Sequence, residues 1–129
     1  PFLKDNNLYL YSEFKNILSE YRVFVIEDEV KGIQFYDGNP LIMPNENEIK
    51  KLQKAINMYM LDNDRPMAYT LDIAIFSEKQ KRDLMILECH PFCSVGLYGL
   101  VGSFLPYAYR YGLDYYINNN KKLDTFRKE

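Results

Sequence analysis

The sequence predicts an α+β domain, in which an antiparallel β-sheet carries helices packed on one face. Three observations support this class. Two stretches, Tyr21–Tyr36 and Ala68–Glu88, each contain a pair of apolar runs separated by a polar turn, as a β-hairpin requires. Between them, apolar residues recur at helical spacing over Ile49–Met60. The chain has 129 residues and shows no internal repeat or linker, so residues 1–129 are expected to form a single domain.

The first elements in chain order are strands. Leu8–Tyr11 is predicted to be a short apolar strand. The next stretch, Ser12–Glu20, is ambiguous, because its apolar residues have helical spacing but the segment is short enough to be a loop. Tyr21–Ile26 is β-branched and aromatic, and Val30–Tyr36 alternates in polarity. These two strands are predicted to form a hairpin across the polar turn Glu27–Glu29.

A helix and a second hairpin follow. Asn45 is a predicted N-cap, and Glu48, three residues later, completes the pattern of a capping box. The apolar face of this helix runs over Ile49–Met60. Beyond it, Ala68–Phe76 and Asp83–Glu88 are predicted to be strands joined by a charged turn.

The C-terminal part is rich in tyrosine. Pro106–Asn118 is predicted to be a final helix, and residues 118–129 to be a frayed, solvated tail. The order is therefore strand, hairpin, helix, hairpin and helix.

Composition limits the functions that this chain can have. It is 47% hydrophobic and 26% charged, which is typical of a globular protein. A net charge of −2 argues against nucleic-acid binding by bulk charge. No apolar run approaches the roughly 20 residues of a membrane span, and no secretory signal is visible. The two cysteines, Cys89 and Cys93, are typical of reduced thiols, so we expect a cytoplasmic protein with no membrane or nucleic-acid partner.

The second hairpin brings together side chains that could bind a metal. Pairing its strands places Asp72 opposite Glu88 to within about one residue of register. His90 lies two residues beyond Glu88, so it points to the same face if the chain stays extended. Two carboxylates with open water positions suit Mg²⁺, which binds through a few oxygens and substrate phosphates.

Each of these residues also has a purely structural interpretation. Asp72 can form a structural salt bridge with Arg22 or Arg65, Glu88 can mark a solvated strand end, and His90 can be a hydrogen-bonded structural residue. From the spacing alone, the structural interpretation is favoured.

Two nearby motifs are weaker signals. Cys89, His90 and Cys93 offer three soft ligands where a structural zinc site needs four, and strand alternation puts Cys89 on the face opposite His90. We therefore favour two reduced thiols near a core. Gly96 and Gly99 can form a turn that lets the backbone pass close to another group, but they lack the pattern of a P-loop.

The segments YTLDIAIF and LMILECHPF together resemble the C-terminal half of the ATP-grasp fold, in which one strand carries an Asp and a nearby strand carries Glu-x-Asn. LYLYSEF is similar to the hinge strand that meets adenine. One branch of this fold is the clade named for two arginines and one lysine. Its motifs are similar to the segments SEYRVFVIEDEVKGIQFYDG and GLYG of this chain. The resemblance covers the chain from about Leu8 to Tyr116 and favours the functional interpretation of the hairpin.

The resemblance implies a role for individual residues. Asp72 and Glu88 would hold Mg²⁺ on the phosphates of ATP, and Arg22 would be the catalytic arginine that faces those phosphates. His90 stands where the family usually has Asn, so it would contact phosphate directly, accept a different metal or mark weakened catalysis. The backbone at Tyr11 and Ser12 would form the adenine hinge.

The function implied is ATP- and Mg²⁺-dependent ligation of a carboxylate to an amine, in a small molecule or a peptide, through an acyl-phosphate. An ATP-grasp enzyme closes ATP between two halves, and this chain resembles one half. We therefore expect the chain by itself to be inactive and to need an N-terminal half or a second copy as partner. The alternative is a truncated, non-catalytic module whose tyrosine-rich tail binds a partner. That surface would consist of Tyr107, Tyr109, Tyr111, Tyr115 and Tyr116.

Overall fold

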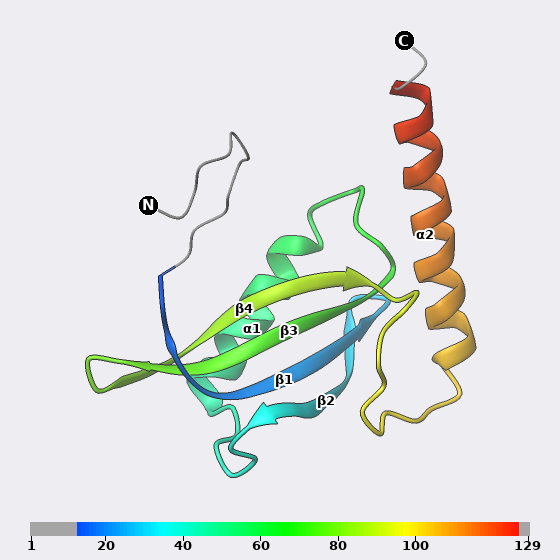
Figure 1. The fold of residues 1–129 in the computed structure, drawn as a ribbon. Helices are drawn as coiled ribbons and strands as arrows, with labels where there is room; N and C mark the ends of the chain where they lie inside the picture. Colours follow the sequence, from blue (N-terminus) through cyan, green and yellow to red (C-terminus); the bar gives the residue numbers. More distant parts are fainter. Residues whose placement is uncertain (1–12, 127–129) are drawn as a thin grey trace, which may run out of the picture.

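The structure is a computed structural model that describes residues 13–126, with side chains described through residue 119. Its four strands are β1 (Asn16–Ile26), β2 (Glu29–Gly38), β3 (Ala68–Glu78) and β4 (Lys81–Pro91). They form one antiparallel sheet in the order β2-β1-β3-β4, so the two hairpins join along β1 and β3 (Figure 1). The α+β class is confirmed, whereas the predicted strand Leu8–Tyr11 lies outside the described residues.

Both hairpins turn within two residues. Glu27 and Asp28 have positive φ angles of 52° and 65°, and Lys79 and Gln80 have 48° and 63°. Two consecutive residues with positive φ make a turn whose twist matches that of the strands. The first turn was predicted, but the second is shorter than the predicted charged turn, because β3 and β4 extend through its flanking residues.

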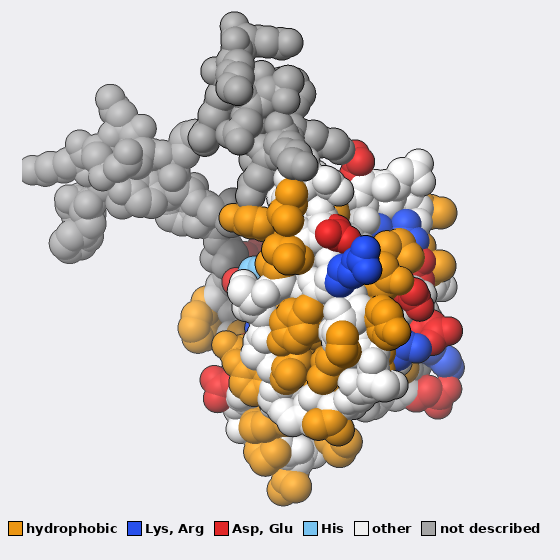
Figure 2. Space-filling model, turned by 90° about the vertical axis from the view of Figure 1, so that its right-hand side faces the viewer, with side chains coloured by type: hydrophobic (Ala, Val, Ile, Leu, Met, Phe, Trp, Pro, Cys, Tyr) orange, Lys and Arg blue, Asp and Glu red, His pale blue; other side chains and the backbone are white. Residues whose placement is uncertain are grey.

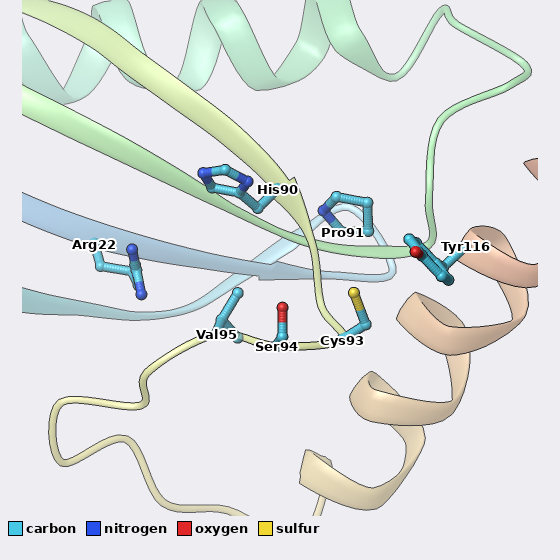
Figure 3. A pocket seen from close by; sticks show the side chains of 7 residues that line it. All are labelled: Arg22, His90, Pro91, Cys93, Ser94, Val95 and Tyr116. Carbon is cyan, nitrogen blue, oxygen red and sulfur yellow. The ribbon is translucent and has the colours of Figure 1, made fainter. Parts of the chain in front are cut away.

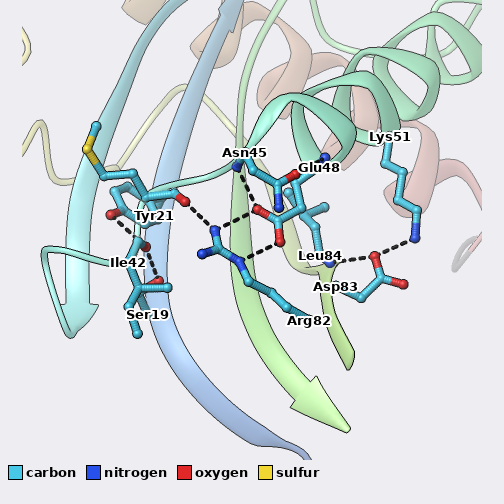
Figure 4. A network of polar contacts seen from close by, with 10 residues as sticks. Ser19, Tyr21, Ile42, Asn45, Glu48, Lys51, Arg82, Asp83 and Leu84 are labelled. Atoms are coloured by element: carbon cyan, nitrogen blue, oxygen red, sulfur yellow. Dashed lines mark hydrogen bonds and ion pairs between the residues drawn. The ribbon is translucent and has the colours of Figure 1, made fainter. Parts of the chain in front are cut away.

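Helix α1 (Glu46–Tyr59) begins at the predicted capping box. The backbone N–H of Glu48 donates to Asn45 Oδ1 at 3.0 Å, and the backbone N–H of Asn45 donates to Glu48 Oε2 at 2.7 Å. The Glu48 carboxylate also accepts hydrogen bonds of 2.7 and 2.8 Å from Arg82 of β4 (Figure 4). One buried carboxylate therefore both caps α1 and fixes it to the sheet.

The sheet is covered on both faces. Leu52 and Ile56 of α1 pack against odd-numbered residues of β1 and β3, including Val23 and Ile73. This first core consists of Tyr21, Val23, Val25, Leu52, Ile56, Tyr69, Leu71, Ile73 and Ile75. Even-numbered strand residues form a second core with α2 and the segment before it. Its members are Phe24, Ile26, Ala68, Phe92, Leu100 and Ala108.

Helix α2 (Leu105–Phe126) differs from its prediction in two respects. It packs on the face opposite α1, at one end of the sheet, so the helices do not share one face (Figure 1). It also continues past Asn118, through residues expected to form a tail, because no Gly or Pro follows Gly112 to end it. Neither helix within residues 13–126 combines the length and apolar character needed to cross a membrane.

Candidate functional site

The predicted site residues lie on the sheet face opposite α1. Asp72 of β3 pairs with Arg22 of β1 on one side and with Glu88 of β4 on the other. His90 pairs with Thr70, two residues before Asp72. Because directly opposed residues share a face, all of these side chains project from the same face. The predicted register of Asp72 and Glu88 is confirmed.

A β-bulge in β4 sets this arrangement. Asp72 pairs with Glu88 and Ile73 with Ile86, so Leu87 is an extra residue without a partner. Before the bulge, Leu84 and Ile86 face α1. After it, Glu88 and His90 face the other way, because one inserted residue reverses the alternation. The bulge therefore allows an apolar strand to end in a polar cluster on the opposite face.

Arg22 and Asp72 form a buried bidentate ion pair. Arg22 Nε donates to Asp72 Oδ1 at 2.7 Å, and a terminal nitrogen donates to Oδ2 at 2.6 Å. The two side chains are only 10% and 7% exposed. The hydrogen bonds to Asp72 raise the pKa of the Arg22 guanidinium above its usual value, although burial acts in the opposite direction. The salt bridge of the structural interpretation is thus present, and its partner is Arg22 rather than Arg65.

Two tyrosines hold the Arg22 guanidinium in place. Its central carbon lies 5.4 Å from the ring centroid of Tyr36 and 5.2 Å from that of Tyr98, within the range of cation–π interaction. A third nitrogen donates to the carbonyl of Gly96 at 3.4 Å. Tyr98 and Gly99 have φ angles of 47° and 89°, so the loop turns sharply here. The glycine-rich motif therefore places an aromatic ring and a carbonyl around the arginine.

The outer part of the cluster is open. His90 Nε2 lies 2.7 Å from Glu88 Oε2, and the two side chains are 49% and 62% exposed, respectively. Glu20 of β1 adds a third carboxylate to this face. Burial, followed by the charges of Asp37, Asp72 and Glu88, raises the pKa of the Glu20 carboxyl. A face with this excess of carboxylates over guanidinium groups attracts cations.

A pocket of about 350 Å³ lies beside the cluster, between the end of β4 and helix α2 (Figure 3). Its lining includes Arg22 and His90, so groups from both the buried and the exposed part of the cluster reach it. The full set is Arg22, His90, Pro91, Cys93, Ser94, Val95 and Tyr116. Room for a ligand therefore exists next to the charged groups.

The donor atoms of the cluster fit a divalent cation. One ligand atom each from Asp72, Glu88 and His90 can be chosen so that all lie within 4.8 Å of one another. Each Asp72 oxygen accepts one hydrogen bond from Arg22, and a carboxylate oxygen has a second lone pair to offer. Two carboxylate oxygens and an imidazole nitrogen are all common metal ligands in proteins.

The cysteines do not join this cluster. Cys89 pairs with Leu71 and lines a groove against Tyr59 of α1, on the face opposite His90. Burial raises the pKa of the Cys89 thiol, although a hydrogen bond with Tyr59 lowers it. Cys93 lines the pocket of Figure 3. In the described part of the chain, the metal-compatible group contains neither cysteine.

Sequence reasoning missed four residues of this face. Tyr36 and Tyr98 were seen only as members of a strand and a motif, and Glu20 lay in the ambiguous segment. Thr70 gave no signal at all, although its buried hydroxyl lies beside the cluster. The register of the whole sheet, which the hairpins alone do not give, would have indicated Glu20, Tyr36 and Thr70, whereas Tyr98 lies in the loop after β4. The predicted hinge residues Tyr11 and Ser12 lie outside the described residues.

Comparison with known protein families gives a match over most of the chain. Residues 3–104 match a family model described as an ATP-grasp domain, family 2 of the clade named for two arginines and one lysine. The matched range includes every strand of the sheet, helix α1 and the whole cluster, and it ends just before α2. Comparison with curated proteins and with solved structures gave no match.

Proposed function

The chain belongs to the ATP-grasp domain family, in family 2 of the two-arginine, one-lysine clade, and from this membership we propose that it forms the metal- and phosphate-binding part of an ATP-dependent carboxylate–amine ligase. The family supports ATP binding and a ligase-related function in general. The observation that carries the finer proposal is the convergence of Asp72, Glu88 and His90 beside a pocket lined by Arg22.

Each residue has a role in this proposal. Asp72 and Glu88 would hold Mg²⁺, and His90 would complete the ligand set or contact a phosphate. When bound, the cation neutralises phosphate charge and stabilises the charge that develops during phosphoryl transfer. Arg22 would orient Asp72 through its bidentate contact, and its third nitrogen, which donates one N–H to the Gly96 carbonyl, would offer its second N–H to the phosphates from the pocket wall.

The proposed reaction has two steps. A substrate carboxylate oxygen attacks the γ-phosphorus of ATP, which forms an acyl-phosphate and releases ADP. An amine then attacks the acyl carbon, an amide bond forms, and inorganic phosphate leaves with the electrons of the broken C–O bond. The protein contributes positioning and charge stabilisation, and no side chain of this chain need be a nucleophile.

The ATP-grasp fold closes nucleotide between two halves, so we propose that a second half, from another segment or another chain, completes the site. The test is ADP release by the completed protein with candidate carboxylates and amines. Steady-state release should require both substrates, because the carboxylate alone supports only the first step, and it should be lost in Glu88→Gln. Cys93→Ser, a change in the same pocket outside the metal ligands, should leave it unchanged. Completed protein that binds no nucleotide would refute the proposal.

A second candidate, a non-catalytic interaction module, is favoured by helix α2. This helix lies beyond the family match and leaves apolar side chains exposed, namely Tyr107, Leu113, Tyr116 and Ile117. Figure 2, which views the right-hand side of Figure 1, shows apolar side chains gathered on this side of the molecule. Not all of the tyrosines are free for a partner, because Tyr109 and Tyr111 pack against the second core. Nucleotide binding without turnover in the completed protein would support this module.

A further inference from the structure

The imidazole of His90 distinguishes this cluster from a site built of oxygen atoms alone. It lies in contact with Glu88 and within 4.8 Å of a ligand atom of Asp72. Among the described residues, no lysine or arginine forms a hydrogen bond or ion pair with Glu88 or His90, which instead bond to each other, so no cationic side chain competes with a metal for them. The cluster therefore offers two oxygens and one nitrogen.

A second observation also points to a ligand at this place. The Thr70 hydroxyl is completely buried and has no hydrogen-bond partner among the described residues. Thr70 is directly opposite His90 and two residues before Asp72, on the same face. An unpartnered buried hydroxyl costs free energy, on the order of 1–3 kcal/mol. A water molecule bound to a metal in the cluster would be a suitable partner for it.

The donor set decides which cation is preferred. Mg²⁺ is small and hard, and it favours oxygen ligands and retained water. First-row transition dications accept imidazole nitrogen readily, and among them Mn²⁺ also accepts carboxylate and water. A site with two carboxylates, one imidazole and an open side therefore discriminates against Mg²⁺ and leaves coordination positions for phosphate oxygens.

We propose that Asp72, Glu88 and His90 form a site that selects Mn²⁺ over Mg²⁺, with His90 as the residue that determines the choice. This inference rests on the proposed function, because it specifies the metal of the same site. In this inference His90 binds the metal and does not contact phosphate.

The test is direct metal binding to the 129-residue chain without nucleotide. The electron paramagnetic resonance signal of free Mn²⁺ falls as the ion binds, and Mg²⁺ affinity follows from competition. We expect Mn²⁺ to bind at least about tenfold more tightly than Mg²⁺. His90→Asn, and His90→Gln as a second variant, should weaken Mn²⁺ binding at least about tenfold and change Mg²⁺ binding less than about threefold. Glu46→Gln, at an exposed carboxylate on α1 outside the cluster, is the control and should change neither affinity.

Three results would overturn the inference, and they bear differently on the proposed function. If Mg²⁺ binds as tightly as Mn²⁺ and Glu88→Gln removes both, the metal site of the proposed function stands and only the selectivity is wrong. If both histidine variants keep the Mn²⁺ preference, His90 is not its source. If neither cation binds at millimolar concentration, both the inference and the metal role of the cluster fail.

Discussion

The buried pair of Arg22 and Asp72 is the residue-scale feature on which the candidate site depends. Burying two charges is costly, and the cost is offset here by two short hydrogen bonds and by the rings of Tyr36 and Tyr98. The same contacts leave Asp72 only a few orientations. A structural ion pair and a metal ligand are therefore compatible in one residue, although they first appeared as alternatives.

Asp72→Asn should destabilise the fold strongly. The substitution removes one charge and leaves Arg22 buried without its partner, a change that costs about 3–5 kcal/mol in the free energy of unfolding. Denaturant-induced unfolding measures this change. Lys50→Ala is the matched control, because it removes the exposed pair with Glu46 on α1 and should cost less than about 0.5 kcal/mol. A loss below about 1 kcal/mol in Asp72→Asn would show that the pair contributes little.

Glu20→Gln should stabilise the protein at neutral pH. The pKa of Glu20 is raised in the folded state, so the folded protein binds its proton more tightly than the unfolded chain does. Protonated Glu20 therefore contributes stability at pH values below its pKa in the unfolded chain. That stability is lost as the pH rises through the pKa of Glu20 in the folded protein. The variant should therefore have the higher Tm at about pH 7, and the difference should shrink below about pH 4. Thermal melts across this range check it, and an equal Tm at neutral pH would contradict the assigned cause.

At the scale of elements, the bulge at Leu87 connects the apolar and polar parts of β4. Leu84 and Ile86 pack toward α1 and fix the first part of the strand. One extra residue then turns Glu88 and His90 to the opposite face. Bulges commonly re-aim side chains near functional sites, and here the consequence is the meeting of Glu88 with Asp72.

Inserting one alanine between Leu87 and Glu88 should abolish metal binding. If residues 81–86 keep their places, Glu88 then lies opposite Leu71 and faces α1 when the bulge persists, or opposite Thr70 when the strand pairs regularly, and in neither case is it opposite Asp72. Deleting Leu87 is the matched control, because Glu88 then follows Ile86 directly and still pairs with Asp72, so this variant should bind Mn²⁺ like the unchanged chain in the same resonance titration. A folded insertion variant that binds Mn²⁺ normally would show that the cluster does not depend on this register.

The elements that the sequence predicts well are those specified locally. Alternation identifies most of each strand, and the capping pair Asn45 and Glu48 marks where α1 begins. The start of β1 at Asn16 was hidden, because a register shift at Leu18 breaks the alternation and leaves apolar residues at helical spacing. The length of α2 was underestimated, since a run of asparagines suggested a tail but supplied no stop signal.

The candidate site was only partly predictable for the same reason. Asp72, Glu88 and His90 belong to one hairpin, so local register brings them together. The contact of Asp72 with Arg22 requires β1 to pair with β3, and these two residues are 50 positions apart in sequence. The contacts of Tyr36 and Tyr98 with Arg22 depend further on β2 and on the loop after β4. Such long-range pairings follow from the whole sheet and not from any single segment.

At the scale of the whole molecule, the described residues form one sheet that is covered on both faces. The charged cluster on it has a buried part and a part exposed to solvent. Arg22 and Asp72 are buried, and the rings of Tyr36 and Tyr98 and the Gly96 carbonyl surround the guanidinium. Glu88 and His90 remain substantially exposed to solvent. A small cation can reach three ligands in this arrangement, whereas a nucleotide would be held along one side only.

The 129-residue chain by itself should bind Mg²⁺-ATP weakly or not at all, and should not turn it over. Charges that face water act in a high dielectric, where each contact contributes little. Binding would still carry its full entropic cost with only part of the contacts. Calorimetric titration tests this expectation directly, and supplying the complementary half should restore binding unless Glu88 is changed to Gln. Micromolar affinity, about −8 kcal/mol, would contradict the argument, because it would require this chain, alone or as a dimer, to complete its own site.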